Sequence, residues 1–235
     1  MNKYILRAIE EHLQKCSVTL KDVRQKITPI IKDLTDTLEE QEKLIDTITH
    51  FYRDTYNLKH ETCIIEDHNG NQYKNDGEKD HVEIPPEAAE EGHENGLLYG
   101  IHNHPDTVGE QSGPDFLTMA NLNQKYSICT GKGTITIAKN TNGKLTMEQL
   151  GMLMFNDDIQ NSIIAMDLAF TADTNGLGEI NRDFEEGKIN VAEHRALTEK
   201  RMNRILDKNF ERDVGNYSKG LEELGLPITY KGVRI

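Results

Sequence analysis

Two histidines, a serine and an aspartate lie close together in the middle of the sequence, as His102, His104, Ser112 and Asp115. Residues separated by one position in an extended strand point to the same side, so both imidazoles can reach one ion. Two imidazole nitrogens and a carboxylate oxygen suit Zn²⁺ and leave its fourth position for water, as in catalytic sites. We therefore predict that His102, His104 and Asp115 hold a single Zn²⁺ ion.

A zinc-bound water also needs a general base within hydrogen-bond reach. Glu61 directly precedes an apolar, strand-like run, Thr62–Ile65, which can lie beside the histidine-bearing strand. Glu66 is the alternative base, but its odd offset from Glu61 sends its side chain to the opposite face of a strand. We therefore expect Glu61 to activate the water for hydrolysis of an amide bond.

The spacing of these residues resembles the signature of the JAMM/MPN+ zinc metalloproteases. The matching positions are His102-x-His104-Pro105, then six residues, Ser112, two residues and Asp115. The tripeptide Glu61-Thr62-Cys63 is similar to the one at the glutamate of deubiquitinating members. The sequence His-Asn-His-Pro is closer to the RadC-like and phage-head-associated branches. The resemblance covers residues 58–140.

The resemblance implies a role for each matching residue. His102, His104 and Asp115 would bind zinc, and Glu61 would be the base that later returns its proton to the leaving amine. Ser112 would donate a hydrogen bond to the oxyanion. Serine is also favoured at helix N-termini, so Ser112 can instead cap the helix that follows, and both roles stay open.

The sequence departs from the family pattern in three places. Gln111 precedes the serine, where the family usually has proline, and Asn103 stands where serine or threonine is common. The segment between Glu61 and His102 lacks the larger insertions with which deubiquitinating members hold ubiquitin. We expect a protein or peptide substrate, with a ubiquitin-like modifier or a capsid protein as candidate partners. The alternatives are a virion-associated assembly or maturation module and a zinc-binding module without activity.

Three regions of the chain must position these residues. Residues 1–57 are predicted to be helical, residues 58–146 to form the JAMM-like core, and residues 147–235 to be helical again. The resemblance and the strand–turn pattern together indicate an α/β (α+β) fold with a curved, mixed and largely antiparallel sheet and packed helices. The helical extensions stand on both sides of this core in sequence.

The N-terminal region shows helical periodicity in two apolar runs, at residues 20–34 and 38–51. Thr35 or Asp36 is predicted to cap the second run, and Pro29 is expected to kink or split the first. Such an amphipathic hairpin either covers a core or pairs with another subunit. Self-association through the terminal helices is therefore a further expectation.

The core is predicted to alternate short strands with turns and helices. The expected elements are strands at 62–65, 97–101, 126–130 and 134–138, a turn at 69–71, a helix at 87–91, a loop at 92–96 and a helix after Pro114. Cys63 and Cys129 fall in apolar strands and are expected to be buried, inert thiols. Beyond the core, the pattern predicts a helical block at 150–170, a long helix at 191–224 and an extended tail after Pro227.

Composition limits the classes of function. The net charge of −13 disfavours nucleic-acid binding, because an acidic surface repels phosphates. No apolar run reaches the length of about eighteen residues that suggests a membrane span, and the charged N-terminus is unlike a signal peptide. The three cysteines are odd in number and far apart, as in a reduced cytoplasmic protein. We therefore expect a cytoplasmic location, or the host cytoplasm or virion for a viral protein.

Overall fold

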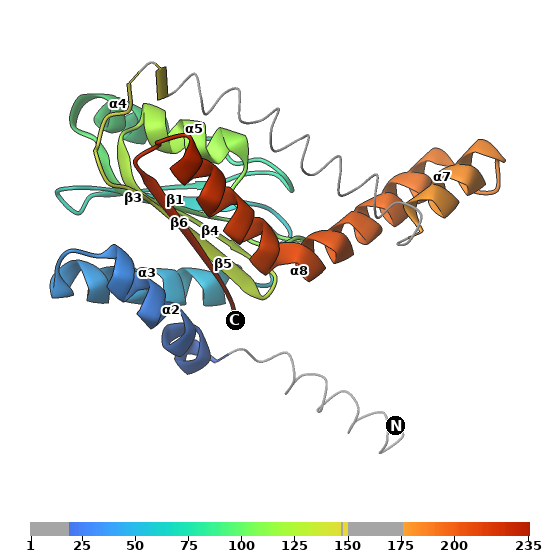
Figure 1. Cartoon of the computed structure of the whole chain (residues 1–235), viewed down its shortest axis with the longest axis horizontal. Coiled ribbons are helices and arrows are strands. Elements are labelled where there is room, and N and C mark those ends of the chain that lie inside the picture. Colours follow the sequence, from blue (N-terminus) through green and yellow to red (C-terminus); the bar gives the residue numbers. More distant parts are fainter. Residues whose placement is uncertain (1–18, 147, 150–175) are drawn as a thin grey trace.

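A six-stranded mixed sheet forms the centre of the computed structural model, which describes residues 19–146, 148–149 and 176–235 (Figure 1). The strand order is β2-β1-β3-β4-β5-β6. Only the β3–β4 pair is parallel among these neighbours. The strands are β1 (Thr62–Asp67), β2 (Gln72–Asp76), β3 (Leu97–Asn103), β4 (Gln124–Gly131), β5 (Thr134–Asn140) and β6 (Ile228–Arg234). The predicted α+β fold with a largely antiparallel sheet is confirmed.

An N-terminal hairpin of helices covers one face of the sheet. It consists of α2 (Leu20–Leu34) and α3 (Leu38–Thr55), which share a buried apolar core with β3, β4 and β5. Each fully buried aliphatic side chain in such a core contributes about 1.5–3 kcal/mol. The prediction that this hairpin covers a core is therefore confirmed.

The predicted cap of the second helix was wrong, and of the two outcomes expected at Pro29, a kink or a split, the split does not occur. Thr37, and neither Thr35 nor Asp36, caps α3, because its side chain accepts a hydrogen bond from the backbone N–H of Glu40. Pro29 lies inside α2 without splitting it, and packing of the apolar face against the sheet outweighs the lost backbone hydrogen bond.

The opposite face carries α4 (Pro86–Asn95), α5 (Gly113–Asn121) and the second half of α8 (Figure 1). The sequence predicted a helix at 87–91 and a loop at 92–96, but α4 continues to Asn95. Gly92 lies inside this helix and packs against Leu122, where an added Cβ would be 2.9 Å from the Leu122 Cβ. The chain turns instead at Gly96, which has φ +77°.

The C-terminal region supplies both helices and an edge of the sheet. The helix α8 (Val191–Glu223) matches the predicted long helix closely, whereas α7 (Leu177–Glu185) was not predicted. The predicted extended tail is β6, which pairs antiparallel with β5 from Asn140↔Ile228 to Thr134↔Arg234. The predicted block at 150–170 lies outside the described residues. Within those residues, none of the helices is both long enough and apolar enough to span a bilayer.

Candidate metal centre

The two histidines meet at the end of β3. His102 lies in the strand, and His104 follows it with its backbone N–H donating to the Thr130 carbonyl at 2.7 Å, which keeps the chain extended. The Nε2 atoms of His102 and His104 are 3.3 Å apart. The prediction that both imidazoles point to the same side is therefore confirmed.

Asp115 approaches this pair from the first turn of α5. Its Oδ1 lies 3.4 Å from Nε2 of His102, while its Oδ2 accepts hydrogen bonds from the backbone N–H and the hydroxyl of Ser112, both at 2.7 Å. Ser112 is the N-cap of α5 and forms a capping box with Asp115. The capping role of Ser112 is thus confirmed, and it orients the carboxylate toward His102.

These distances fit a tetrahedral metal ion. Ligand atoms with bonds of about 2.0–2.1 Å to a tetrahedral centre lie about 3.3–3.4 Å from one another. The two measured separations, His102 to His104 at 3.3 Å and His102 to Asp115 at 3.4 Å, both have this length. The donor set present in the structure therefore suits a metal such as zinc.

Cys129 is a further possible ligand that the sequence did not indicate. It pairs in register with His102 across β3 and β4, and the ligand atoms of His102, His104 and Cys129 all lie within 4.8 Å of one another. These three residues form a group that could hold a metal ion. The thiol is fully buried, and burial raises its pKa well above the usual value. Asp115 lies 3.4 Å from His102 but is outside this group of mutually close ligand atoms, and its carboxylate is ionised more readily than the buried thiol.

The surroundings of the site favour a neutral His104 and an ionised Asp115. Burial, reinforced by the neighbouring His102, lowers the pKa of His104 to about 4. Nδ1 of His104 lies 3.3 Å from the Val108 carbonyl oxygen, so this nitrogen donates and leaves Nε2 free to bind a metal. Burial opposes ionisation of Asp115, but His102, His104 and the Ser112 hydrogen bonds hold its pKa below the usual value.

Glu61 stands on the other side of the histidines, just before β1. Its Oε1 is 4.0 Å from Nε2 of His104, and the residue is 8% exposed. Burial, together with the charges of Asp115 and Asp80, raises the pKa of Glu61 to about 7. The strand β1 pairs with β3 as expected, which is what brings Glu61 beside the histidines.

Glu66 points to the opposite face of the sheet, as the odd offset predicted. There it forms an ion pair with Lys43 of α3 and accepts hydrogen bonds from Tyr99 at 2.9 Å and Gln72 at 2.8 Å. Glu66 therefore lies away from the metal centre and binds α3 to the sheet.

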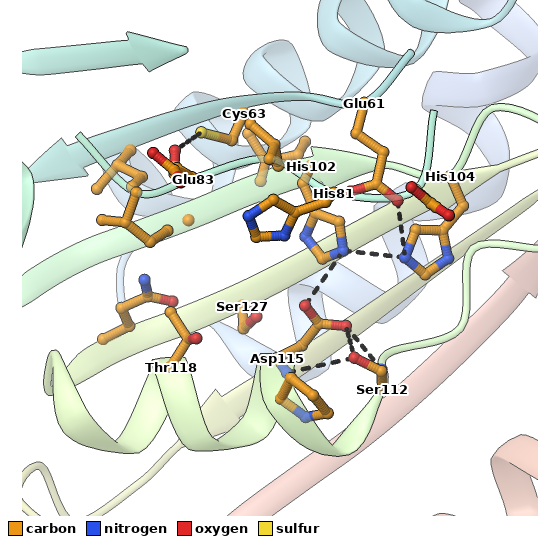
Figure 2. Close-up of a pocket in the computed structure, with 18 residues that line it drawn as sticks. Glu61, Cys63, His81, Glu83, His102, His104, Ser112, Asp115, Thr118 and Ser127 are labelled. Atoms are coloured by element: carbon orange, nitrogen blue, oxygen red, sulfur yellow. Dashed lines mark hydrogen bonds and ion pairs between the residues drawn. The ribbon is translucent and has the colours of Figure 1, made fainter. Parts of the chain in front are cut away.

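All five predicted site residues line one cavity of 560 Å³ (Figure 2). Apolar side chains, including Ile65, Val82 and Ile84, extend the cavity away from the histidines. His81 and Asp80 also line it, and sequence reasoning missed both because they lie in a polar stretch with no recognisable motif. Their approach to Glu61 depends on a turn that only the structure reveals.

No model of a known protein family, no curated protein and no solved structure matches the chain. The chemistry of the site must therefore be argued from its own geometry.

Proposed function

We propose that this protein is a zinc-dependent peptidase or isopeptidase of the JAMM type. The observation that carries the proposal is that Nε2 of His102 lies 3.3 Å from Nε2 of His104 and 3.4 Å from Oδ1 of Asp115, with Glu61 at 4.0 Å from His104 in the same cavity. Two nitrogens and one oxygen leave an open position, which is typical of catalytic rather than structural zinc sites.

The zinc ion, when bound, would lower the pKa of water towards about 7 and polarise the carbonyl of the scissile bond. Glu61 accepts the proton of the attacking water and passes it to the leaving amine. Without a metal ion, burial raises the pKa of Glu61 to about 7, and the charge of a bound zinc ion would lower it, so the carboxylate would be ionised and able to accept a proton when zinc is in place. The partly apolar cavity limits access of bulk water to these groups.

The structure supports a positioning role for Ser112. Its hydroxyl donates to Asp115 at 2.7 Å, so it holds the carboxylate toward His102. A hydrogen bond from Ser112 to an oxyanion would require this hydroxyl to leave Asp115, and that role stays a prediction. We propose a cytoplasmic polypeptide as substrate, in keeping with the acidic net charge of −13.

Metal analysis of the purified full-length chain tests the first half of the proposal. After incubation with zinc and removal of the excess, we expect about one zinc per chain. His102→Ala and Asp115→Ala should lose the metal, whereas His68→Ala, at an exposed turn, should retain it. Cys129→Ser distinguishes the two ligand sets, since loss of zinc in this variant would favour the sulfur ligand. Full zinc content in His102→Ala would refute the site.

Hydrolysis tests the second half. The zinc-loaded protein is incubated with a peptide library and with lysine-linked isopeptides, and the products are identified by mass spectrometry. We expect cleavage by the wild type and none by Glu61→Gln, which should still bind zinc. Stoichiometric zinc without cleavage of any peptide would instead favour the zinc-binding module.

A further inference from the structure

A tight turn is hydrogen-bonded directly to the backbone of Glu61. The Glu61 N–H donates to the Glu78 carbonyl at 2.6 Å, and the Gly77 N–H donates to the Glu61 carbonyl at 2.8 Å. The Glu78 N–H then donates to the His81 carbonyl at 2.7 Å, which closes the turn. We call residues 77–82 the His81 turn. Its position is therefore coupled to that of the proposed base.

Gly77 makes this turn possible. A Cβ at this position would lie 2.0 Å from the carbonyl oxygen of His81 and 2.6 Å from Cα of Val82. Both neighbours are backbone atoms, so any larger residue would force the turn open. The absence of a side chain at Gly77 thus lets the chain fold back closely on itself, and this places His81 at the cavity.

The imidazole of His81 points into the same cavity as the metal centre. His81, Glu61, His102 and His104 all line it. In Figure 2 the His81 ring is drawn beside the His102 ring, in the same cavity. His81 is exposed, so its ring nitrogens are accessible to a ligand in the cavity.

Amide hydrolysis is assisted by a hydrogen-bond donor beside the reacting carbonyl oxygen. When water adds to an amide carbonyl, the carbonyl oxygen becomes negative and is stabilised by donors aimed at it. The hydroxyl of Ser112 already donates to Asp115, and the thiol of Cys63 faces the Glu83 carbonyl. Thr118 and Ser127 lie farther from Glu61 in Figure 2.

We propose that His81 is a catalytic residue that donates an N–H hydrogen bond to the scissile carbonyl oxygen as it gains negative charge. Imidazole carries an N–H in both its neutral and its charged form, so the role needs no particular protonation state. The inference rests on the proposed function, because it assigns a contact to the substrate of that same site. Loss of one such donor should lower kcat about 10²-fold.

Two substitutions at position 81 separate the donor from the shape of the ring. His81→Phe keeps an aromatic ring without an N–H, and His81→Gln keeps an N–H donor. His68→Phe is the matched control on an exposed histidine outside the cavity. All variants are zinc-loaded, and their zinc content and melting temperature are measured first. We expect both quantities to be unchanged.

The kinetic arm uses a peptide that the wild type cleaves. We expect His81→Phe to lower kcat about 10²-fold with little change in KM, His81→Gln to recover part of the loss, and His68→Phe to have no effect. A His81→Phe variant with wild-type kcat would overturn the proposal.

A binding arm does not depend on turnover. Acetohydroxamate presents a carbonyl oxygen to zinc, so its Kd for the zinc-loaded chain is measured by calorimetry. We expect about tenfold weaker binding to His81→Phe, which corresponds to one lost hydrogen bond. Equal affinity for both proteins would also overturn the role of His81 while leaving the zinc site intact. A wild type that binds no zinc refutes the proposed function itself, and the His81 contact with it.

Discussion

Two glutamates on one stretch of chain, Glu61 and Glu66, meet opposite environments across the sheet. Glu66 faces α3 and is satisfied by Lys43, Gln72 and Tyr99, which hold its pKa below the usual value against the effect of burial. Glu61 faces the cavity, where its Oε1 lies 4.0 Å from Nε2 of the neutral His104 ring, and burial raises its pKa to about 7.

The difference separates a structural carboxylate from one that is available for chemistry. A buried carboxylate with an ion pair and hydrogen bonds fixes the elements around it, whereas one without such partners is held in a state that readily exchanges a proton. The four predictions below test this separation.

Exchange of Glu61 should have the largest effect, and on activity alone. Glu61→Gln keeps the shape of the side chain but cannot accept a proton, so hydrolysis should fall about 10²–10⁴-fold. Zinc content should stay at the wild-type level. Cleavage rates and metal analysis on the same preparation measure both quantities. A variant that retained most of its activity would remove Glu61 from the mechanism.

Exchange of Glu66 should have the reverse effect. Glu66→Gln loses the ion pair with Lys43 and weakens two hydrogen bonds, so the free energy of unfolding should fall by about 1–3 kcal/mol. Zinc binding should be retained, because the residue lies on the other face of the sheet. Urea denaturation gives the stability, and loss of zinc from a folded Glu66→Gln protein would contradict the separation of the two faces.

The two carboxylates should also give pH dependences of opposite sign in the metal-free protein. The pKa of Glu61 rises from 4.5 to about 7 on folding, so the native state holds the extra proton and stability decreases as pH rises across this range. Over this pH range, we expect the free energy of unfolding of Glu61→Gln to fall by about 1–2 kcal/mol less than that of the wild type, after allowance for solvent screening.

For Glu66 the pKa is lowered on folding, so its stabilisation is present above the ordinary pKa and is lost as pH falls through the lowered one. Denaturation curves of the wild type and of both variants, recorded from about pH 2 to pH 8, compare the two slopes. Equal slopes for the two variants would contradict the assignment.

Loss of Lys43 should have the smallest effect. Its side chain is 40% exposed, and Glu66 would keep its hydrogen bonds to Tyr99 and Gln72. We expect Lys43→Gln to cost about 0.5–1 kcal/mol, as for a partly exposed ion pair. The same denaturation assay measures it, and a cost greater than that of Glu66→Gln would show that Lys43 has a further role.

The sequence predicted the parts of the site that depend on local spacing. Alternation along a strand was enough to place His102 and His104 on one side, and the odd offset was enough to send Glu66 to the other. The fold class followed from the pattern of strands, turns and helices. The identity of the metal and the reaction stay predictions.

The parts that were missed depend on contacts between distant segments. Gly92 packs inside α4 against Leu122, and the His81 turn closes because Gly77 has no side chain. Cys129 joins the histidines only through strand pairing. Each of these features depends on a partner that local periodicity does not contain.

The late position of β6 along the chain has a consequence for synthesis. Among the described residues, the outer edge of β5 is covered by β6, so during translation this edge stays open until residues 228–234 have left the ribosome and α8 has been made. An uncovered strand edge is a template for pairing with other chains. Nascent molecules therefore pass through a period in which aggregation competes with completion of the sheet, and early termination within α8 would leave that edge permanently exposed.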